Sequence, residues 1–211
     1  LYLLSWKVAP AIGMGNTVVC KPSELTPMTA DLLMRVIEKV GLPAGVVNLV
    51  HGTGAEAGAP LVEHEDVRFV SFTGGTATGA IVARAAAGSF KKLSLELGGK
   101  NATIILDDYD LDRHMGAIVR ASYLNQGQVC LCGSRILVHS SIKETFTRRF
   151  VDTVEHLRIG DPSDNSTELG SLISKEHLNK VQSYVSLAIE EGGELLTGGD
   201  KPCLPQTFEG G

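Results

Sequence analysis

The 211-residue sequence has no long apolar run, no basic block and no cysteine framework. Its apolar stretches fall short of the roughly 18 residues that suggest a membrane span, so no membrane partner is expected. Nineteen Lys and Arg against 24 Asp and Glu give a formal net charge of −5, which argues against nucleic acid as a partner. Four cysteines without framework spacing indicate a reducing compartment, and we expect a cytoplasmic protein.

The two ends of the sequence show neither a targeting signal nor a closing element. The apolar start, residues 1–4, has no basic lead-in and continues into Trp6 and Lys7, which predicts a helix interior rather than a signal peptide. The last residues, 208–211, close no predicted element. We therefore expect truncation at both ends. Between them, 43% hydrophobic and 20% charged residues make an ordinary globular composition.

Strand-like and helix-like segments alternate along the chain. The predicted strands are 17–20, 46–50, 67–72, 92–97, 103–106, 135–138 and 194–196. The predicted helices are 29–40, 55–64, 76–87, 111–124, 143–157 and 175–191. Such alternation implies an α/β fold with crossover connections and a parallel sheet, which binds ligands at the carboxyl ends of its strands. A second α/β unit starts near the Gly98-Gly99 pair, a plausible hinge.

Two polar or glycine-rich segments follow predicted strands. In Lys21-Pro22-Ser23-Glu24, the lysine and carboxylate could grip a ribose, or the segment could be a turn capped by Ser23 or Thr26 before a helix. The Thr73-Gly74-Gly75 turn lies between a strand and a helix, where backbone N–H groups can meet a phosphate. It is not the GxGxxG fingerprint, so an ordinary turn stays open as an alternative.

Glu96 and Cys130 are the candidate catalytic side chains. Glu96 ends a predicted strand among apolar neighbours, where burial would make it a usable general base. Cys130 follows in a loop whose backbone amides could stabilise a thiolate and an oxyanion. Alone, a free cysteine is more often a small core hydrophobe, and a metal site with Cys132 is weakly indicated. Cys132 could be a packing residue or a resolving thiol.

Together these segments resemble the aldehyde dehydrogenase superfamily, whose motifs occur here in the same order and spacing over residues 1–211. The motifs are 21–27 (KPSELTP), 72–74 (FTG), 95–101 (LELGGKN) and 123–130 (YLNQGQVC). The resemblance implies a Rossmann-like, parallel-sheet NAD-binding domain, of which residues 1–97 are part, followed by part of a second α/β domain, the catalytic one, at residues 98–211. A small-molecule aldehyde would be the substrate.

The resemblance also assigns roles to individual residues. Cys130 would be the nucleophile and would supply part of the oxyanion hole with its N–H, while Glu96 would activate water. The implied cofactor contacts are Lys21, Ser23, Glu24, Gly52, Gly54, Gly58, Phe72, Thr73, Gly74, Gly75 and Leu97. A carboxylate at Glu24 favours NAD over NADP. Many members have Ser where this chain has Gly75, so a hydroxyl contact to phosphate is lost.

Other family parts are not in the sequence. The oxyanion-hole Asn would precede Leu1, and the Glu that holds the nicotinamide ribose would follow Gly211, so we expect the chain alone to be inactive. For the whole protein we expect a homodimer or homotetramer. Within the superfamily, residues 131–135, 161–164 and 172–178 resemble the 2-aminomuconic semialdehyde dehydrogenase group and its bacterial hydroxymuconic relatives. Betaine aldehyde and retinal type enzymes share much of this sequence.

Two alternatives remain open. The chain could be an inactive nucleotide-binding or scaffold module, because parts of the family's site are missing from it. It could also be a CoA-acylating relative, although Glu96 argues against this because such enzymes need no water-activating base.

Overall fold

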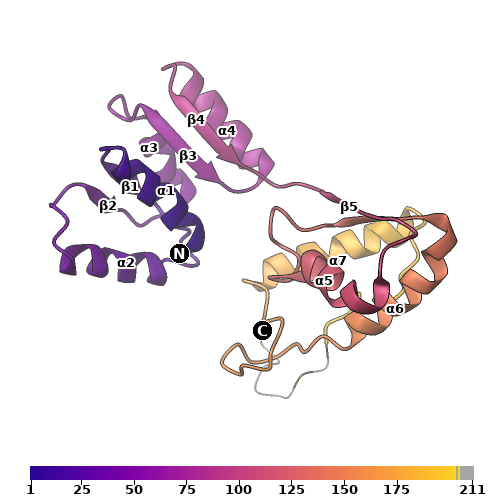
Figure 1. Cartoon of the computed structure of the whole chain (residues 1–211). Helices are drawn as coiled ribbons and strands as arrows, with labels where there is room; N and C mark the ends of the chain where they lie inside the picture. Colours follow the sequence, from indigo (N-terminus) through magenta and orange to yellow (C-terminus); the bar gives the residue numbers. More distant parts are fainter. Residues whose placement is uncertain (203, 205–211) are drawn as a thin grey trace. The chain divides into compact units, whose positions relative to one another are not determined.

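The computed structural model describes residues 1–202 and 204 and divides into two compact units, Leu1–Gly98 and Gly99–Gly211 (Figure 1). Cys203 and the predicted open end at 208–211 lie outside the described residues. Each unit is built from parallel strand pairs whose strands are joined by a helix, as the alternating pattern predicted.

The first unit contains two such βαβ arrangements (Figure 1). Its elements are α1 (Tyr2–Gly13), β1 (Val18–Cys20), α2 (Met28–Lys39), β2 (Val47–Leu49), η1 (Gly54–Gly58), α3 (Ala59–Glu63), β3 (Phe69–Thr73), α4 (Thr76–Ala87) and β4 (Lys92–Glu96). Strand β1 pairs with β2 across α2, and β3 pairs with β4 across α4. The described residues form these two separate pairs rather than one continuous sheet.

The core of the first unit lies between α4 and the β3–β4 pair. Helix α4 is rich in alanine, so its backbone approaches the strands closely, and Ala86 is completely buried. The core residues Val62, Val82 and Ala86 pack against partly buried side chains of the strands. These strand residues are Val70, Phe72, Leu93 and Leu95. The packing fixes the carboxyl ends of β3 and β4, where Thr73 lies in register with Glu96.

The second unit has one βαβ arrangement followed by helices. Its elements are β5 (Ala102–Ile105), α5 (Leu111–Tyr123), β6 (Arg135–Val138), η2 (Ser140–Ile142), α6 (Lys143–Glu155) and α7 (Lys175–Glu190). Helix α5 starts at the side chain of Asp110, which accepts a hydrogen bond from the Arg113 N–H at 3.1 Å. The core joins β5, α5 and α6 through Ile105, Leu111, Met115, Ile118 and Phe146.

Two sequence predictions differ from the structure. Residues 194–196, predicted as a strand, have no strand partner within the described chain, and an extended segment without a partner is not a strand. The predicted helix 55–64 begins with the wider π-helical turn η1 and becomes α-helical at Ala59. Pro60 lacks the N–H that would bond to the Glu56 carbonyl in a continuous α-helix, which explains the change.

In the described part of the chain, none of the helices combines the length and apolar character that spanning a bilayer requires.

Candidate active site

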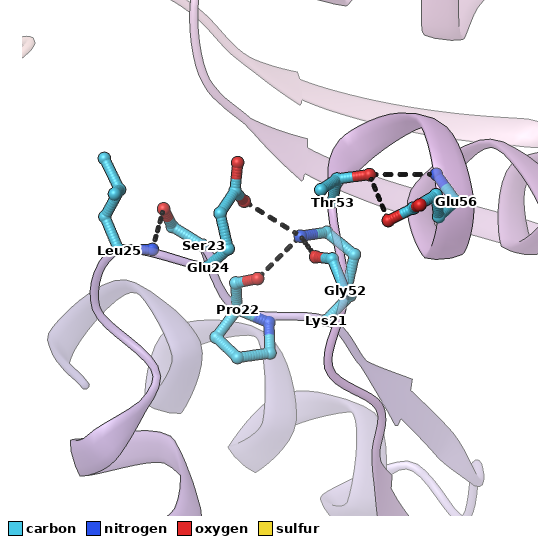
Figure 2. Close-up of polar contacts among 8 residues, drawn as sticks. All are labelled: Lys21, Pro22, Ser23, Glu24, Leu25, Gly52, Thr53 and Glu56. Atoms are coloured by element: carbon cyan, nitrogen blue, oxygen red, sulfur yellow. Dashed lines mark hydrogen bonds and ion pairs between the residues drawn. The ribbon is translucent and has the colours of Figure 1, made fainter.

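The Lys21 side chain, after β1, lies beside three other predicted cofactor residues: Glu24 and Gly52 (Figure 2), and Gly58. Lys21 Nζ donates to the Pro22 carbonyl at 2.6 Å and to the Gly52 carbonyl at 3.0 Å, and it lies 3.8 Å from a Glu24 carboxylate oxygen. A Cβ at Gly58 would lie 3.6 Å from the Lys21 side chain. The carboxyl ends of β1 and β2 therefore meet at Lys21, which is largely buried, with 17% of its side chain exposed.

Glu24 and Ser23 lie on the exposed side of this cradle. The Glu24 side chain is 52% exposed, so its carboxylate is open to a ligand. Ser23 Oγ accepts from the Leu25 N–H at 3.3 Å, which makes a local turn. The predicted cap by Ser23 or Thr26 is wrong, because α2 follows Pro27 and the described residues provide no side-chain cap for it.

The turn after β2 is shaped by Gly52 and a reciprocal cap (Figure 2). Gly52 has φ of +143°, and a Cβ there would lie 2.9 Å from Ala57 Cβ, so a side chain does not fit without movement. Thr53 Oγ1 accepts from the Glu56 N–H at 3.2 Å and bonds to the Glu56 carboxylate at 3.0 Å. Gly54 begins the π-helical turn that follows.

The second predicted cofactor turn joins β3 to α4. The Gly74 N–H donates to the Glu96 carbonyl at 3.0 Å, which ties the turn to the end of β4. Gly75 is the N-cap of α4, and none of the described side chains caps this helix, so the first N–H groups of a 12-residue helix are available to an anion. The Phe72 ring packs over Gly74, where a Cβ would lie only 2.5 Å from it, while Thr73 is exposed.

Leu97 is held against α4. A Cβ at Gly79 would lie 2.5 Å from a Leu97 methyl group, so the glycine leaves space for this side chain. Leu97 follows Glu96 directly, and its packing fixes the chain where it leaves β4.

Glu96 is the last residue of β4 and is exposed. The burial predicted for this carboxylate is therefore wrong in the first unit as it is described. Leu95 and Leu97 are partly buried, whereas Glu96 is exposed. Successive side chains of an extended segment lie on opposite faces, so the two leucines share one face and Glu96 lies on the other.

Lys7 was missed in the sequence prediction of this site. Its Nζ donates to Ser71 Oγ at 2.7 Å, which connects α1 to β3. Burial lowers the pKa of Lys7 below its ordinary value of 10.5, and the negative charge of Glu96 partly opposes this shift. The signal in the sequence was its position, because Lys7 is the one charged residue within the apolar segment 2–13.

Cys130 lies in an exposed turn of the second unit, so the alternative of a buried core residue does not hold for it. The loop that carries Cys130 begins with Asn125, Gln126 and Gly127, three consecutive residues with φ of 52°, 56° and 71°. With its amide oriented to satisfy both neighbours, Gln126 accepts from the Gly170 N–H at 3.1 Å and donates to the Asn125 carbonyl at 3.0 Å. A rigid turn thus presents the Cys130 thiol to solvent.

The other cysteines differ from Cys130 in exposure. Cys132 is 5% exposed and its sulfur lies 3.8 Å from the Leu124 carbonyl oxygen, as a packing residue would. Burial raises the pKa of the Cys20 thiol. Residues 1–202 and 204 contain no cluster of three or more His, Cys, Asp or Glu side chains placed to hold a metal ion.

Comparison with known proteins gives consistent matches over the whole chain. The family model described as "Aldehyde dehydrogenase family" matches residues 1–210. The chain is 51% identical to 2-aminomuconic semialdehyde dehydrogenase of Danio rerio and 47% identical to 2-hydroxymuconic semialdehyde dehydrogenase of Pseudomonas sp. (strain CF600), with 100% of the chain aligned to each. It spans 44% of the length of each of these relatives.

A solved structure is similar as well. It is a betaine aldehyde dehydrogenase double mutant from Staphylococcus aureus in complex with NAD+ and with a BME-modified cysteine. The TM-score is 0.94 at 42% sequence identity, and the match covers 98% of this chain and 42% of that one.

Proposed function

Because this chain belongs to the aldehyde dehydrogenase family, we propose that it is the central part of an enzyme that oxidises an aldehyde with NAD as hydride acceptor. The observation that carries the proposal is the exposed Cys130 thiol in a rigid turn, within a chain that also has a built cradle around Lys21. We assign the first unit to a Rossmann-like NAD-binding domain and the second to the catalytic domain. The whole protein is proposed to be a cytoplasmic homodimer or homotetramer.

In this mechanism Cys130 attacks the aldehyde carbon as a thiolate and forms a thiohemiacetal. The Cys130 N–H donates to the oxyanion that develops on the former carbonyl oxygen. Lys21, Glu24 and the start of α4 would hold NAD, which would supply the hydride acceptor, and loss of hydride from the thiohemiacetal carbon would leave a thioester on Cys130. Glu96 then takes a proton from water, which attacks the thioester and releases the carboxylic acid. Hydrolysis through Glu96 supports a carboxylic acid product over a CoA ester.

The described residues fit NAD in two places. The uncapped start of α4 at Gly75 can receive the pyrophosphate through backbone N–H groups, because a helix N-terminus favours anions. Lys21 and Glu24 lie at the carboxyl ends of parallel strands, where a ribose can exchange hydrogen bonds with an ammonium group and a carboxylate. Gly52 and Gly58 keep this place free of side chains. We propose Ser23, Gly54, Phe72, Thr73, Gly74 and Leu97 as further residues of this surface.

The substrate is proposed to be a muconic-type semialdehyde. The support is the identity of about half of all positions to 2-aminomuconic semialdehyde dehydrogenase and nearly as many to the 2-hydroxymuconic enzyme.

The nucleophile is tested by Cys130→Ala in a chain of the full length of its relatives. We expect aldehyde-dependent NADH formation to fall by at least about a thousandfold, because the covalent step has no other exposed thiol in the described residues. Cys132→Ala is the matched control and should retain most activity. Undiminished turnover in Cys130→Ala would contradict the mechanism.

The cofactor preference is tested by Glu24→Gln in the 211-residue chain. A carboxylate beside the ribose repels a 2′-phosphate, so its removal should improve NADP+ affinity relative to NAD+ by about tenfold. Titration calorimetry with both dinucleotides measures this ratio, and Glu38→Gln on the exposed side of α2 makes the same charge change elsewhere. An unchanged ratio would place the ribose away from Glu24, and no binding of either dinucleotide to the unaltered chain would favour the scaffold alternative.

A further inference from the structure

The peptide group between Cys130 and Leu131 is held by a residue that lies outside the Cys130 loop. Asn101 Nδ2 donates a hydrogen bond to the Cys130 carbonyl oxygen at 2.6 Å, from a position 29 residues earlier in the sequence. Short turns usually fix their own carbonyls through bonds to neighbouring residues, as Val129 does by accepting from the Cys132 N–H at 2.9 Å. The carbonyl of the nucleophile is thus fixed by a separate segment.

The segment that carries Asn101 is itself anchored in the second unit. The Arg135 N–H donates to the Asn101 carbonyl at 3.1 Å, and Arg135 Nε donates to the Lys100 carbonyl at 3.0 Å. Gly99 lies beside the Cys130 carbonyl oxygen, because a Cβ at Gly99 would be 3.6 Å from this oxygen. Asn101 is therefore a fixed donor directly before β5, the first strand of the second unit.

A second contact fixes the far end of the loop. Gly133 donates its N–H to the Ala121 carbonyl at 3.1 Å, and Ser122 Oγ lies 3.3 Å from the Gly133 carbonyl. Gln126 holds the entry of the loop and α5 holds its exit. Without Asn101, the peptide between Cys130 and Leu131 would lose the hydrogen bond that orients its carbonyl group and would be freer to rotate. The Asn101 amide removes this freedom at the residue that performs the chemistry.

We propose that Asn101 is a positioning residue for the nucleophile: its side-chain amide holds the Cys130 carbonyl toward the 99–101 segment and so keeps the negative end of that peptide dipole away from the thiolate. This inference rests on the proposed function, because it matters only if Cys130 reacts as a thiolate. A released carbonyl could rotate toward its own sulfur, where its partial negative charge would disfavour the thiolate.

The test is the alkylation rate of Cys130 by iodoacetamide in the 211-residue chain, followed on the Cys130 peptide by mass spectrometry. Asn101→Leu has nearly the same size and no donor, and we expect the rate near pH 8 to fall by roughly threefold to tenfold, the range of one hydrogen bond. Asn101→Gln keeps the donor on a longer side chain and should recover at least half of the rate. A structural residue alone would not give this rescue.

A matched control removes the same kind of contact in the other unit. Asn16 Nδ2 donates to the Ala11 carbonyl at 3.1 Å and is exposed, so Asn16→Leu should leave the alkylation rate of Cys130 unchanged. Thermal melting of every variant shows whether the fold is intact. If Asn101→Leu does not fold, the comparison of Asn101→Gln with Asn101→Asp decides, because Asp replaces the donor by a charged acceptor and should react more slowly.

The outcomes separate the inference from the proposed function. A reactive Cys130 whose rate is the same in Asn101→Leu and in the unaltered chain would overturn the role of Asn101 alone. A Cys130 that reacts no faster than glutathione in the unaltered chain would contradict the proposed nucleophile and, with it, the need for positioning.

Discussion

Single side chains at the ends of strands carry the charges of the proposed cofactor surface. Lys21 shows the principle, because two carbonyl groups and one carboxylate surround its ammonium group while its stem is covered. Lys7 is a different case, since burial disfavours its charge and one hydroxyl group is its hydrogen-bond partner. The two lysines thus differ in the number of acceptor groups around their ammonium groups.

The pH dependence of stability should reveal the lowered pKa of Lys7. At neutral pH Lys7 keeps its proton in both the folded and the unfolded chain, and its partly buried charge destabilises the folded state. As the pH rises through the lowered pKa toward 10.5, the folded chain loses the proton first, so this cost is relieved and stability increases. The free energy of unfolding of the unaltered chain should therefore rise relative to Lys7→Met between about pH 7 and pH 10.

Urea unfolding at several pH values measures this difference, and other titrating groups cancel between the two proteins. Lys39→Met, on the exposed end of α2, is the control for the loss of a lysine side chain. A difference between the unaltered chain and Lys7→Met that stays flat over this range would mean that Lys7 titrates equally in both states.

Residue-level prediction from the sequence depended on what each role requires. The positions of Lys21 and Gly52 after predicted strands followed from local patterns, whereas the hydrogen bond between them, which spans 31 residues, did not. The exposure of Glu96 could not be predicted, since burial is set by elements packed from elsewhere. Lys7 acts through Ser71, 64 residues away, and no local pattern contains that distance. Asn101 and the Cys130 carbonyl are separated in the same way.

At the scale of elements, single polar side chains cap the starts of some of the described helices, although α2 and α4 have no such cap. Asp110 before α5, Ser174 before α7 and Thr53 before η1 each accept a backbone N–H. Helix α5 also supplies four buried residues to the second unit and leads directly into the Cys130 loop. Its N-terminal cap is therefore coupled to both the core and the candidate site.

Removing the cap of α5 should lower the stability of the second unit. Asp110→Ala leaves the Arg113 N–H without its acceptor at 3.1 Å, and we expect a loss of about 1 kcal/mol, or a fall in melting temperature of about 4 to 8 °C. Asp108→Ala removes an exposed carboxylate two residues earlier and serves as the control, with a change within about 0.5 kcal/mol. Equal effects of the two substitutions would mean that charge rather than capping matters.

Most helices and strands could be predicted because their signals are local. The β-prone runs before Lys21 and after Gly133, and the apolar periodicity of α2 and α5, gave elements within a few residues of the observed bounds. The strand predicted at 194–196 was wrong, because a strand requires a partner strand and the described chain has none for these residues. The π-helical turn before Ala59 was not predicted, because it depends on the missing N–H of a single residue, Pro60.

On the scale of the whole molecule, the described residues form two separate hydrophobic core clusters. Val82 and Ala86 belong to the first, and Phe146 belongs to the second, with its ring stacked on Phe150 at a centroid distance of 5.4 Å. The two cores share no residue. Each unit can therefore lose stability through its own core.

Phe146→Ala should destabilise the second unit by about 3 to 5 kcal/mol, because it removes a ring that is only 5% exposed and leaves a cavity. Hydrogen exchange monitored by mass spectrometry should show faster exchange in residues 99–202 and unchanged exchange in 1–98. Val82→Ala is the reciprocal control and should affect the first unit. Uniformly faster exchange in both units after Phe146→Ala would mean that the chain unfolds as one cooperative body.

The three left-handed residues before Cys130 limit how this loop can evolve. Asn125 and Gly127 are residue types that adopt a positive φ at little cost, whereas Gln126 needs its contacts with Gly170 and Asn125 to offset that cost. A β-branched residue at any of the three positions would be strongly disfavoured. Mutation can therefore change the exposed side chains around Cys130 far more freely than the backbone turn that presents it, so the loop can vary in chemistry while its shape is kept.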